Sequence, residues 1–109
     1  MIYVDTGALV ALIVREPGSA AVSAWYAAAK SELVSAAWCV TEFASALGLK
    51  QRAAQLDAEQ ARAAWQRFER LVANDVRLLP VEVADFHRAA MLTFDAANGI
   101  RAGDALHLA

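Results

Sequence analysis

Three acidic residues stand in apolar surroundings, where an unpartnered carboxylate is unusual. Asp5 follows the apolar run Ile2–Val4, Glu42 lies inside a mostly apolar segment, and Asp104 opens the last apolar helical pattern of the chain. Each alone has an ordinary explanation, because an acid near a helix start caps the helix or interacts favourably with its dipole. If all three meet at one edge of a sheet, a divalent cation would offset their repulsion, and oxygen ligands favour Mg²⁺ or Mn²⁺ over zinc.

Such a cation would suit chemistry at a phosphate group. Bound divalent ions bridge a scissile phosphate, polarise a phosphoryl oxygen and lower the pKa of an attacking water. The chain carries ten Lys and Arg against twelve Asp and Glu, a formal charge of −2, which argues against nucleic-acid binding by bulk positive charge. His107 lies one helical turn after Asp104 and could share its face, but a histidine in such a setting is more often structural than a ligand.

Short strands and helices alternate along the chain and must position these acids. Strands are expected over Ile2–Val4, Leu33–Ser35 and Val76–Leu79. Helices are expected over about Ala8–Val14, Ala20–Lys30, Trp38–Arg52 and Val83–Ala97, with Asn98–Gly99 as a turn and a further helix over Arg101–Ala109. Asp57 is expected as the N-cap of another long helix that ends at about Ala73. This order predicts a three-layer α/β domain with a mostly parallel central sheet flanked by helices. Asp5 then lies at the carboxyl end of a strand, the edge where ligands bind in such sheets.

The remaining chemistry-bearing residues have two readings each. Cys39 is the only cysteine, which excludes an internal disulfide and a Cys-rich zinc site, and its apolar neighbours indicate a buried small hydrophobe. The aromatic residues fall mostly at helical spacing, which favours core positions, although aromatics are also common at interfaces: Trp25, Tyr26, Trp38, Trp65 and Phe68. Five arginines form either a solvated helix surface or an RNA track, and the former is the simpler interpretation: Arg15, Arg52, Arg62, Arg67 and Arg70.

The 109 residues suit a single domain over residues 1–109. The last residues stop inside an apolar helical pattern without a Gly, Pro or cap, so we expect the natural chain to be longer and the domain to be incomplete at its C-terminus. The N-terminus lacks the features of a signal peptide, and no apolar stretch is long enough to span a bilayer, which predicts a cytoplasmic protein without membrane attachment.

Three motifs together resemble one family. The segment Ile2–Val10 is similar to the start of PIN domains, where apolar residues lead into an Asp followed by Thr or Ser. Val40–Leu47 and Arg101–Ala109 resemble the second and third acidic motifs of that family, in the same order along the chain. The sequence thus resembles the PIN-domain family, and in particular the VapC-type toxins of bacterial toxin–antitoxin pairs.

This resemblance implies a Mg²⁺- or Mn²⁺-dependent endoribonuclease in which a metal-activated water attacks an RNA phosphodiester. Asp5, Glu42 and Asp104 would bind the metal, and Thr6 or Thr41 would support them by hydrogen bonds. The resemblance also implies a homodimer and a cognate antitoxin as partners. The family supplies a fourth acid on a strand beyond the third motif, and this chain ends before it. Since that strand lies beside the first, the C-terminal strands are expected to be missing and Ile2–Val4 to have an open edge.

Two other functions compete with this interpretation. Asp5-Thr6-Gly7 also matches the Asp-Thr-Gly of aspartic proteases, but three residues are a weak signal and that fold is all-β. The stronger alternative is a catalytically silent PIN-like module that binds a protein partner through its apolar helices. The requirement for all three acids in any activity would separate the enzyme from the silent module.

Overall fold

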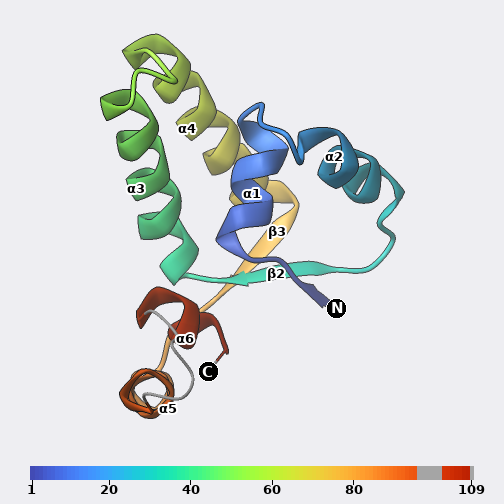
Figure 1. Ribbon diagram of the computed structural model, residues 1–109. Helices are drawn as coiled ribbons and strands as arrows, with labels where there is room; N and C mark the ends of the chain where they lie inside the picture. The colour runs from blue at the N-terminus through green and yellow to red at the C-terminus, as the bar shows by residue number, and fades with distance from the viewer. Residues whose placement is uncertain (96–101, 109) are drawn as a thin grey trace. The chain divides into compact units, whose positions relative to one another are not determined.

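The computed structural model describes residues 1–95 and 102–108, and the chain forms two compact units, Met1–Leu79 and Pro80–Ala109 (Figure 1). The first unit contains, in order, β1 (Ile2–Tyr3), α1 (Thr6–Ile13), α2 (Ser19–Ala28), β2 (Leu33–Ala36), α3 (Trp38–Arg52), α4 (Ala58–Asn74) and β3 (Val76–Leu79). The second unit contains α5 (Val83–Phe94) and α6 (Ala102–Leu108). The single-domain interpretation of residues 1–109 stays a prediction.

The three strands form one parallel sheet in the order β1-β2-β3. Ile2 pairs with Leu33 and Leu33 with Val76, which aligns the three strands along one row. The backbone N–H of Val4 donates to the Val34 carbonyl at 2.7 Å and extends this alignment to the residue before Asp5. The predicted α/β class with a parallel sheet and flanking helices is therefore confirmed.

The core of the first unit lies between the sheet and helices α1, α3 and α4 (Figure 1). Helix α3 buries every fourth residue, Cys39, Phe43 and Leu47, so one side of the helix faces the core. The Phe43 ring stacks on Phe68 of α4 with centroids 4.3 Å apart, and Trp65 stacks on Phe68 at 5.3 Å. These aromatic contacts join α3 to α4 and fix the helix that carries Glu42.

The turn between α3 and α4 has well-defined ends. The Asp57 side chain accepts from the Gln60 N–H at 2.7 Å while the Gln60 side chain accepts from the Asp57 N–H, so the predicted N-cap of α4 is confirmed as a capping box. At the other end, the N–H groups of Gln55 and Ala54 return to the carbonyls of Lys50 and Gln51. This is a Schellman motif, and it places Ala54 at φ 58°, a left-handed conformation that favours glycine.

Some expected boundaries and burials were wrong. Helix α1 begins at Thr6 and not at Ala8, because the Asp5 side chain caps it. Helix α5 ends at Phe94 and not at Ala97, because Asp95 is extended and closes the helix through its N–H to Met91. Trp25 was expected inside, but 40% of its surface is exposed, since α2 has no fully buried residue. The predicted turn Asn98–Gly99 lies outside the described residues.

Within the described residues of the second unit, the buried apolar side chains are Ala89 of α5 and Leu106 of α6. Asp85 accepts from the backbone N–H of Glu82 at 2.9 Å and pairs with Arg88, which secures the first turn of α5. Hydrogen bonding to the Glu82 backbone, together with Arg88, holds the pKa of the Asp85 carboxyl below its usual value. Among the helices described for either unit, none is long and apolar enough to cross a bilayer.

Candidate functional site

Asp5 lies two residues after the end of β1, at the carboxyl edge of the sheet. Its backbone is extended, at φ −80° and ψ 168°, and its Oδ1 accepts from the Ala8 N–H at 2.9 Å. The preceding residue, Val4, is buried in the core and paired with β2, so the position of Asp5 follows from the sheet. Asp5 itself is exposed. The residue therefore caps α1 and at the same time presents a carboxylate to solvent at this edge.

Glu42 is joined to the residue after Asp5. The Thr6 hydroxyl donates to Oε1 of Glu42 at 2.7 Å, although 36 positions separate them in the sequence. Glu42 precedes the buried Phe43 on α3 and is half-buried, beside the core-facing side of the helix. The structure thus brings Asp5, Thr6 and Glu42 to one edge of the first unit, and the role of Thr6 as support for a metal ligand stays a prediction.

The charge of Glu42 influences two neighbouring groups. Burial raises the pKa of the Cys39 thiol, and the Glu42 carboxylate raises it further. Burial also raises the pKa of the Tyr3 phenol, with a hydrogen bond to the Ala36 backbone acting in the opposite direction and Glu42 adding a smaller increase. Cys39 is fully buried, which confirms the structural interpretation of this cysteine. Tyr3 was not recognised as a neighbour of the site from the sequence. Its place in the apolar run Ile2–Val4 predicts a strand but does not indicate a contact with Glu42.

The other predicted site residues lie on α3 and in the second unit. Thr41 is exposed on α3. Asp104 belongs to the second unit, where it lies in the first turn of α6 and is exposed. His107 follows one turn later on the same helix and is half-buried. The grouping of Asp104 with Asp5 and Glu42 therefore stays a prediction.

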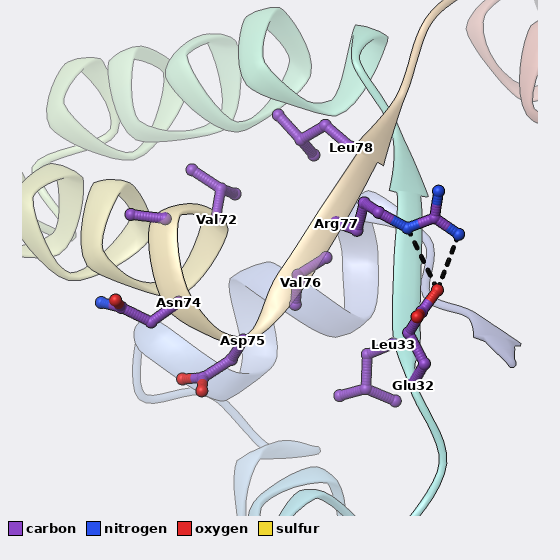
Figure 2. A pocket seen from close by; sticks show the side chains of 9 residues that line it. Glu32, Leu33, Val72, Asn74, Asp75, Val76, Arg77 and Leu78 are labelled. Carbon is purple, nitrogen blue, oxygen red and sulfur yellow. Dashed lines mark hydrogen bonds and ion pairs between the residues drawn. The ribbon is translucent and has the colours of Figure 1, made fainter.

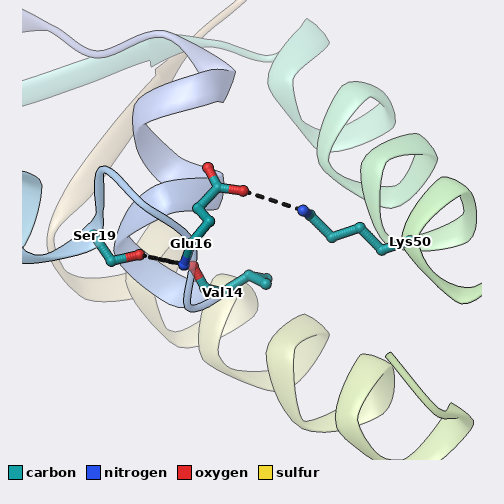
Figure 3. A network of polar contacts seen from close by, with 4 residues as sticks. All are labelled: Val14, Glu16, Ser19 and Lys50. Carbon is teal, nitrogen blue, oxygen red and sulfur yellow. Dashed lines mark hydrogen bonds and ion pairs between the residues drawn. The ribbon is translucent and has the colours of Figure 1, made fainter. Parts of the chain in front are cut away.

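A second polar link joins α1 to α3 at their far ends (Figure 3). The Lys50 ammonium pairs with Oε2 of Glu16 at 3.1 Å, and both side chains are partly buried. Ser19 accepts from the Glu16 N–H at 2.8 Å and donates to the Val14 carbonyl at 3.0 Å, which fixes the loop that carries Glu16. Together with the Thr6–Glu42 bond, this pair holds the two helices at both ends. Local sequence patterns do not reveal it, because Glu16 and Lys50 are 34 positions apart.

The donor groups at this edge fit a hard divalent cation. Asp5 and Glu42 supply carboxylate oxygens, the ligand type of Mg²⁺ and Mn²⁺, while the one thiol nearby is fully buried and unsuited to zinc. Within the described residues of either unit, no group of three or more His, Cys, Asp or Glu side chains is arranged to hold a metal ion by itself. Asp5 and Glu42 therefore stay predicted metal ligands, as does the third acid of the set.

Comparison with known proteins agrees with the fold. The family model described as PIN domain matches residues 2–109. A comparison with curated proteins gave no match. PIN domains are in general nucleases that use divalent metals, a class that suits acidic side chains at the carboxyl edge of a parallel sheet. Because the match covers almost every residue, the chain belongs to the PIN domain family.

Proposed function

We propose that this PIN domain is a metal-dependent endoribonuclease, the toxin of a VapC-type toxin–antitoxin pair, which hydrolyses RNA phosphodiester bonds. The observation that carries the proposal is the 2.7 Å hydrogen bond from Thr6 to Glu42, which holds a half-buried carboxylate beside Asp5. A carboxylate that is oriented by a hydroxyl and lies next to a second acid is a typical arrangement for holding Mg²⁺ or Mn²⁺.

In this proposal, Asp5 and Glu42 hold the metal from the first unit and Asp104 completes the ligand set. Thr6 orients Glu42 by donating to Oε1, and Thr41, the residue before Glu42 on α3, is the other proposed supporting hydroxyl. When bound, the metal supplies positive charge for a phosphoryl oxygen and lowers the pKa of a coordinated water. The charge of −2 on the chain is then compatible with an RNA substrate, because the metal offsets the repulsion between carboxylates and phosphate.

A cognate antitoxin and a second copy of the chain are the proposed protein partners. Exposed apolar side chains on the first unit support a protein-binding surface, since 40% of Trp25 and 62% of Leu49 are exposed. The same observation favours the second candidate function, a catalytically silent PIN module that acts only through protein contacts. Light scattering over a range of concentrations tests the homodimer separately from the chemistry.

The first experiment is a calorimetric titration of Mn²⁺ into the purified chain and into Asp5→Asn, Glu42→Gln and Asp104→Asn. Each substitution removes the charge of one carboxylate while keeping its shape. Glu69→Gln is the matched control, since Glu69 is exposed on α4 and distant in sequence from all three acids. An RNA cleavage assay with the same proteins, with and without Mn²⁺, then measures the activity.

We expect Mn²⁺ binding and RNA cleavage in the wild-type chain and in Glu69→Gln, and the loss of both in Asp5→Asn and Glu42→Gln. Retention of binding in Asp104→Asn would remove Asp104 from the ligand set. Mn²⁺ binding that survives both Asp5→Asn and Glu42→Gln would contradict the proposed site. Absence of binding and cleavage in the wild-type chain would favour the silent module.

A further inference from the structure

Tyr3 is an aromatic residue on the strand that leads to Asp5, and the proposed metal site does not use it. It belongs to β1, and 41% of its surface is exposed, whereas the next residue, Val4, is buried in the core. Trp25 is exposed to the same degree, at 40%, but it lies on α2, outside the sheet. The Tyr3 ring therefore offers an aromatic surface that a ligand can reach.

The Tyr3 side chain leans toward the carboxyl edge of the sheet. Tyr3 pairs in register with Val34 of β2, but its phenol is hydrogen-bonded to the backbone of Ala36, two residues further along that strand. Asp5 follows Tyr3 by two residues on extended backbone, so the two side chains point to the same side, with Cα atoms roughly 7 Å apart. The Glu42 carboxylate is close enough to act on the phenol electrostatically. The ring thus lies beside both predicted metal ligands of the first unit.

Positive charge is a poor candidate for holding RNA on this side of the sheet. The formal charge of the chain is −2. The cation in the same row as Tyr3 is Arg77, since Val34 pairs with both residues, and its guanidinium is already engaged. Its Nε and Nη2 donate to Oε1 of Glu32 at 3.1 Å and 2.7 Å (Figure 2). Base stacking on an aromatic ring needs no cation, and every nucleobase has a face that can stack.

We propose that the Tyr3 ring stacks on a nucleobase of the RNA, next to the phosphate held at Asp5 and Glu42. This inference rests on the proposed nuclease function and names its substrate class, an unpaired stretch of RNA. A base inside a duplex is covered by its neighbours, whereas the bases of single strands are free to stack on aromatic side chains. The hydrogen bond to Ala36 orients the ring before RNA arrives, so less side-chain ordering is lost on binding.

The test uses the whole chain and a set of short single-stranded RNAs in which one adenine is replaced by 2-aminopurine, a fluorescent base whose emission falls when it stacks. The set moves this base along the strand by one position at a time. Ca²⁺ replaces Mn²⁺ in the binding experiment, because it takes the same oxygen ligands, and gels confirm that the RNA stays intact. Tyr3→Leu removes the ring and Tyr3→Phe keeps it. Trp25→Leu is the matched control, because it removes an equally exposed ring.

We expect the wild-type chain, Tyr3→Phe and Trp25→Leu to quench the fluorescence at one position of the strand, and Tyr3→Leu to lose this quenching. With Mn²⁺ present, KM for cleavage should rise about tenfold in Tyr3→Leu, because stacking contributes to RNA binding. The kcat and the calorimetric Mn²⁺ affinity of Tyr3→Leu should stay unchanged, which also shows that this variant is folded.

Absence of quenching by the wild-type chain at every position would overturn the proposal, whatever the variants do. Equal quenching by Tyr3→Leu, or a fall in kcat without a rise in KM, would overturn it as well. Quenching without any cleavage would instead refute the nuclease function and leave base stacking in place. Cleavage without quenching would refute base stacking alone, so the two proposals can fail separately.

Discussion

At the scale of single residues, the arrangement of the candidate site depends on one hydroxyl. Thr6 is the first residue of α1 and reaches Glu42 across the carboxyl edge of the sheet. Its neighbour Asp5 is already committed to capping the same helix through Oδ1. The two carboxylates are therefore oriented by different contacts. The Asp5 carboxylate is held by the N–H of Ala8 in the first turn of α1, and the Glu42 carboxylate by the hydroxyl of Thr6.

The first prediction concerns this hydroxyl. Thr6→Val keeps the shape of the side chain but removes the donor to Glu42, so we expect Mn²⁺ affinity and RNA cleavage to fall by about 10- to 100-fold, the usual effect of losing a hydrogen bond to a metal ligand. Thr6→Ser retains the donor and should restore both. The control is Thr93→Val, which removes a hydroxyl bonded to a helix carbonyl in α5. Wild-type Mn²⁺ affinity in Thr6→Val would show that this contact does not orient a ligand.

At the scale of elements, most boundaries follow from local chemistry and were predicted from the sequence. Helix α3 and strand β3 have the expected limits, and Asp57 caps α4 as its residue type predicts. The candidate acids of the first unit were also recognisable, because their apolar neighbours are unusual for a carboxylate. Contacts between distant segments, such as Glu16 with Lys50, were not predictable, since no local pattern relates residues on different elements.

The second prediction belongs to the turn between α3 and α4. Ala54 adopts φ 58°, where its Cβ is crowded, so Ala54→Gly should raise the free energy of unfolding by about 0.5–1 kcal/mol, as relief of this strain exceeds the extra flexibility of the unfolded chain. Ala53→Gly is the matched control. Ala53 has φ −84°, and glycine there should lower the free energy of unfolding by about 0.5–1 kcal/mol. Urea denaturation measures both, and equal signs would contradict the assignment of strain to Ala54.

At the scale of the whole molecule, the first unit is stabilised by contacts between segments far apart in the chain. Tyr26 of α2 interacts with Asp75, the residue between α4 and β3. Burial, followed by the hydrogen bond to Asp75 and its negative charge, raises the pKa of the Tyr26 phenol from 10.0 to about 12. The protonated phenol is thus favoured by folding, which links the stability of the unit to pH in the alkaline range.

The third prediction follows from the sign of this shift. Because the pKa is raised in the folded state, the stabilisation is complete below pH 10 and is lost as the pH rises from 10 to about 12. Urea denaturation should show a smaller decrease over this range in Tyr26→Phe than in the wild-type chain. The absorbance of tyrosinate provides the check: in Tyr3→Phe, the remaining tyrosine should titrate near pH 12. Titration near pH 10 in that variant would contradict the contact with Asp75.

The stacked rings of Phe43 and Phe68 constrain which substitutions such a protein can accept during evolution. Phe43 is fully buried and directly follows Glu42 on α3. The centroid of its ring lies 4.3 Å from the centroid of the Phe68 ring. A change in the interior at either ring therefore displaces the backbone that carries a functional acid. Natural selection for the reaction would act on these rings as strongly as on the acid, so lineages that keep the activity should also keep the aromatic pair. Conversely, a lineage that has lost the chemistry would be free to exchange both rings for aliphatic side chains.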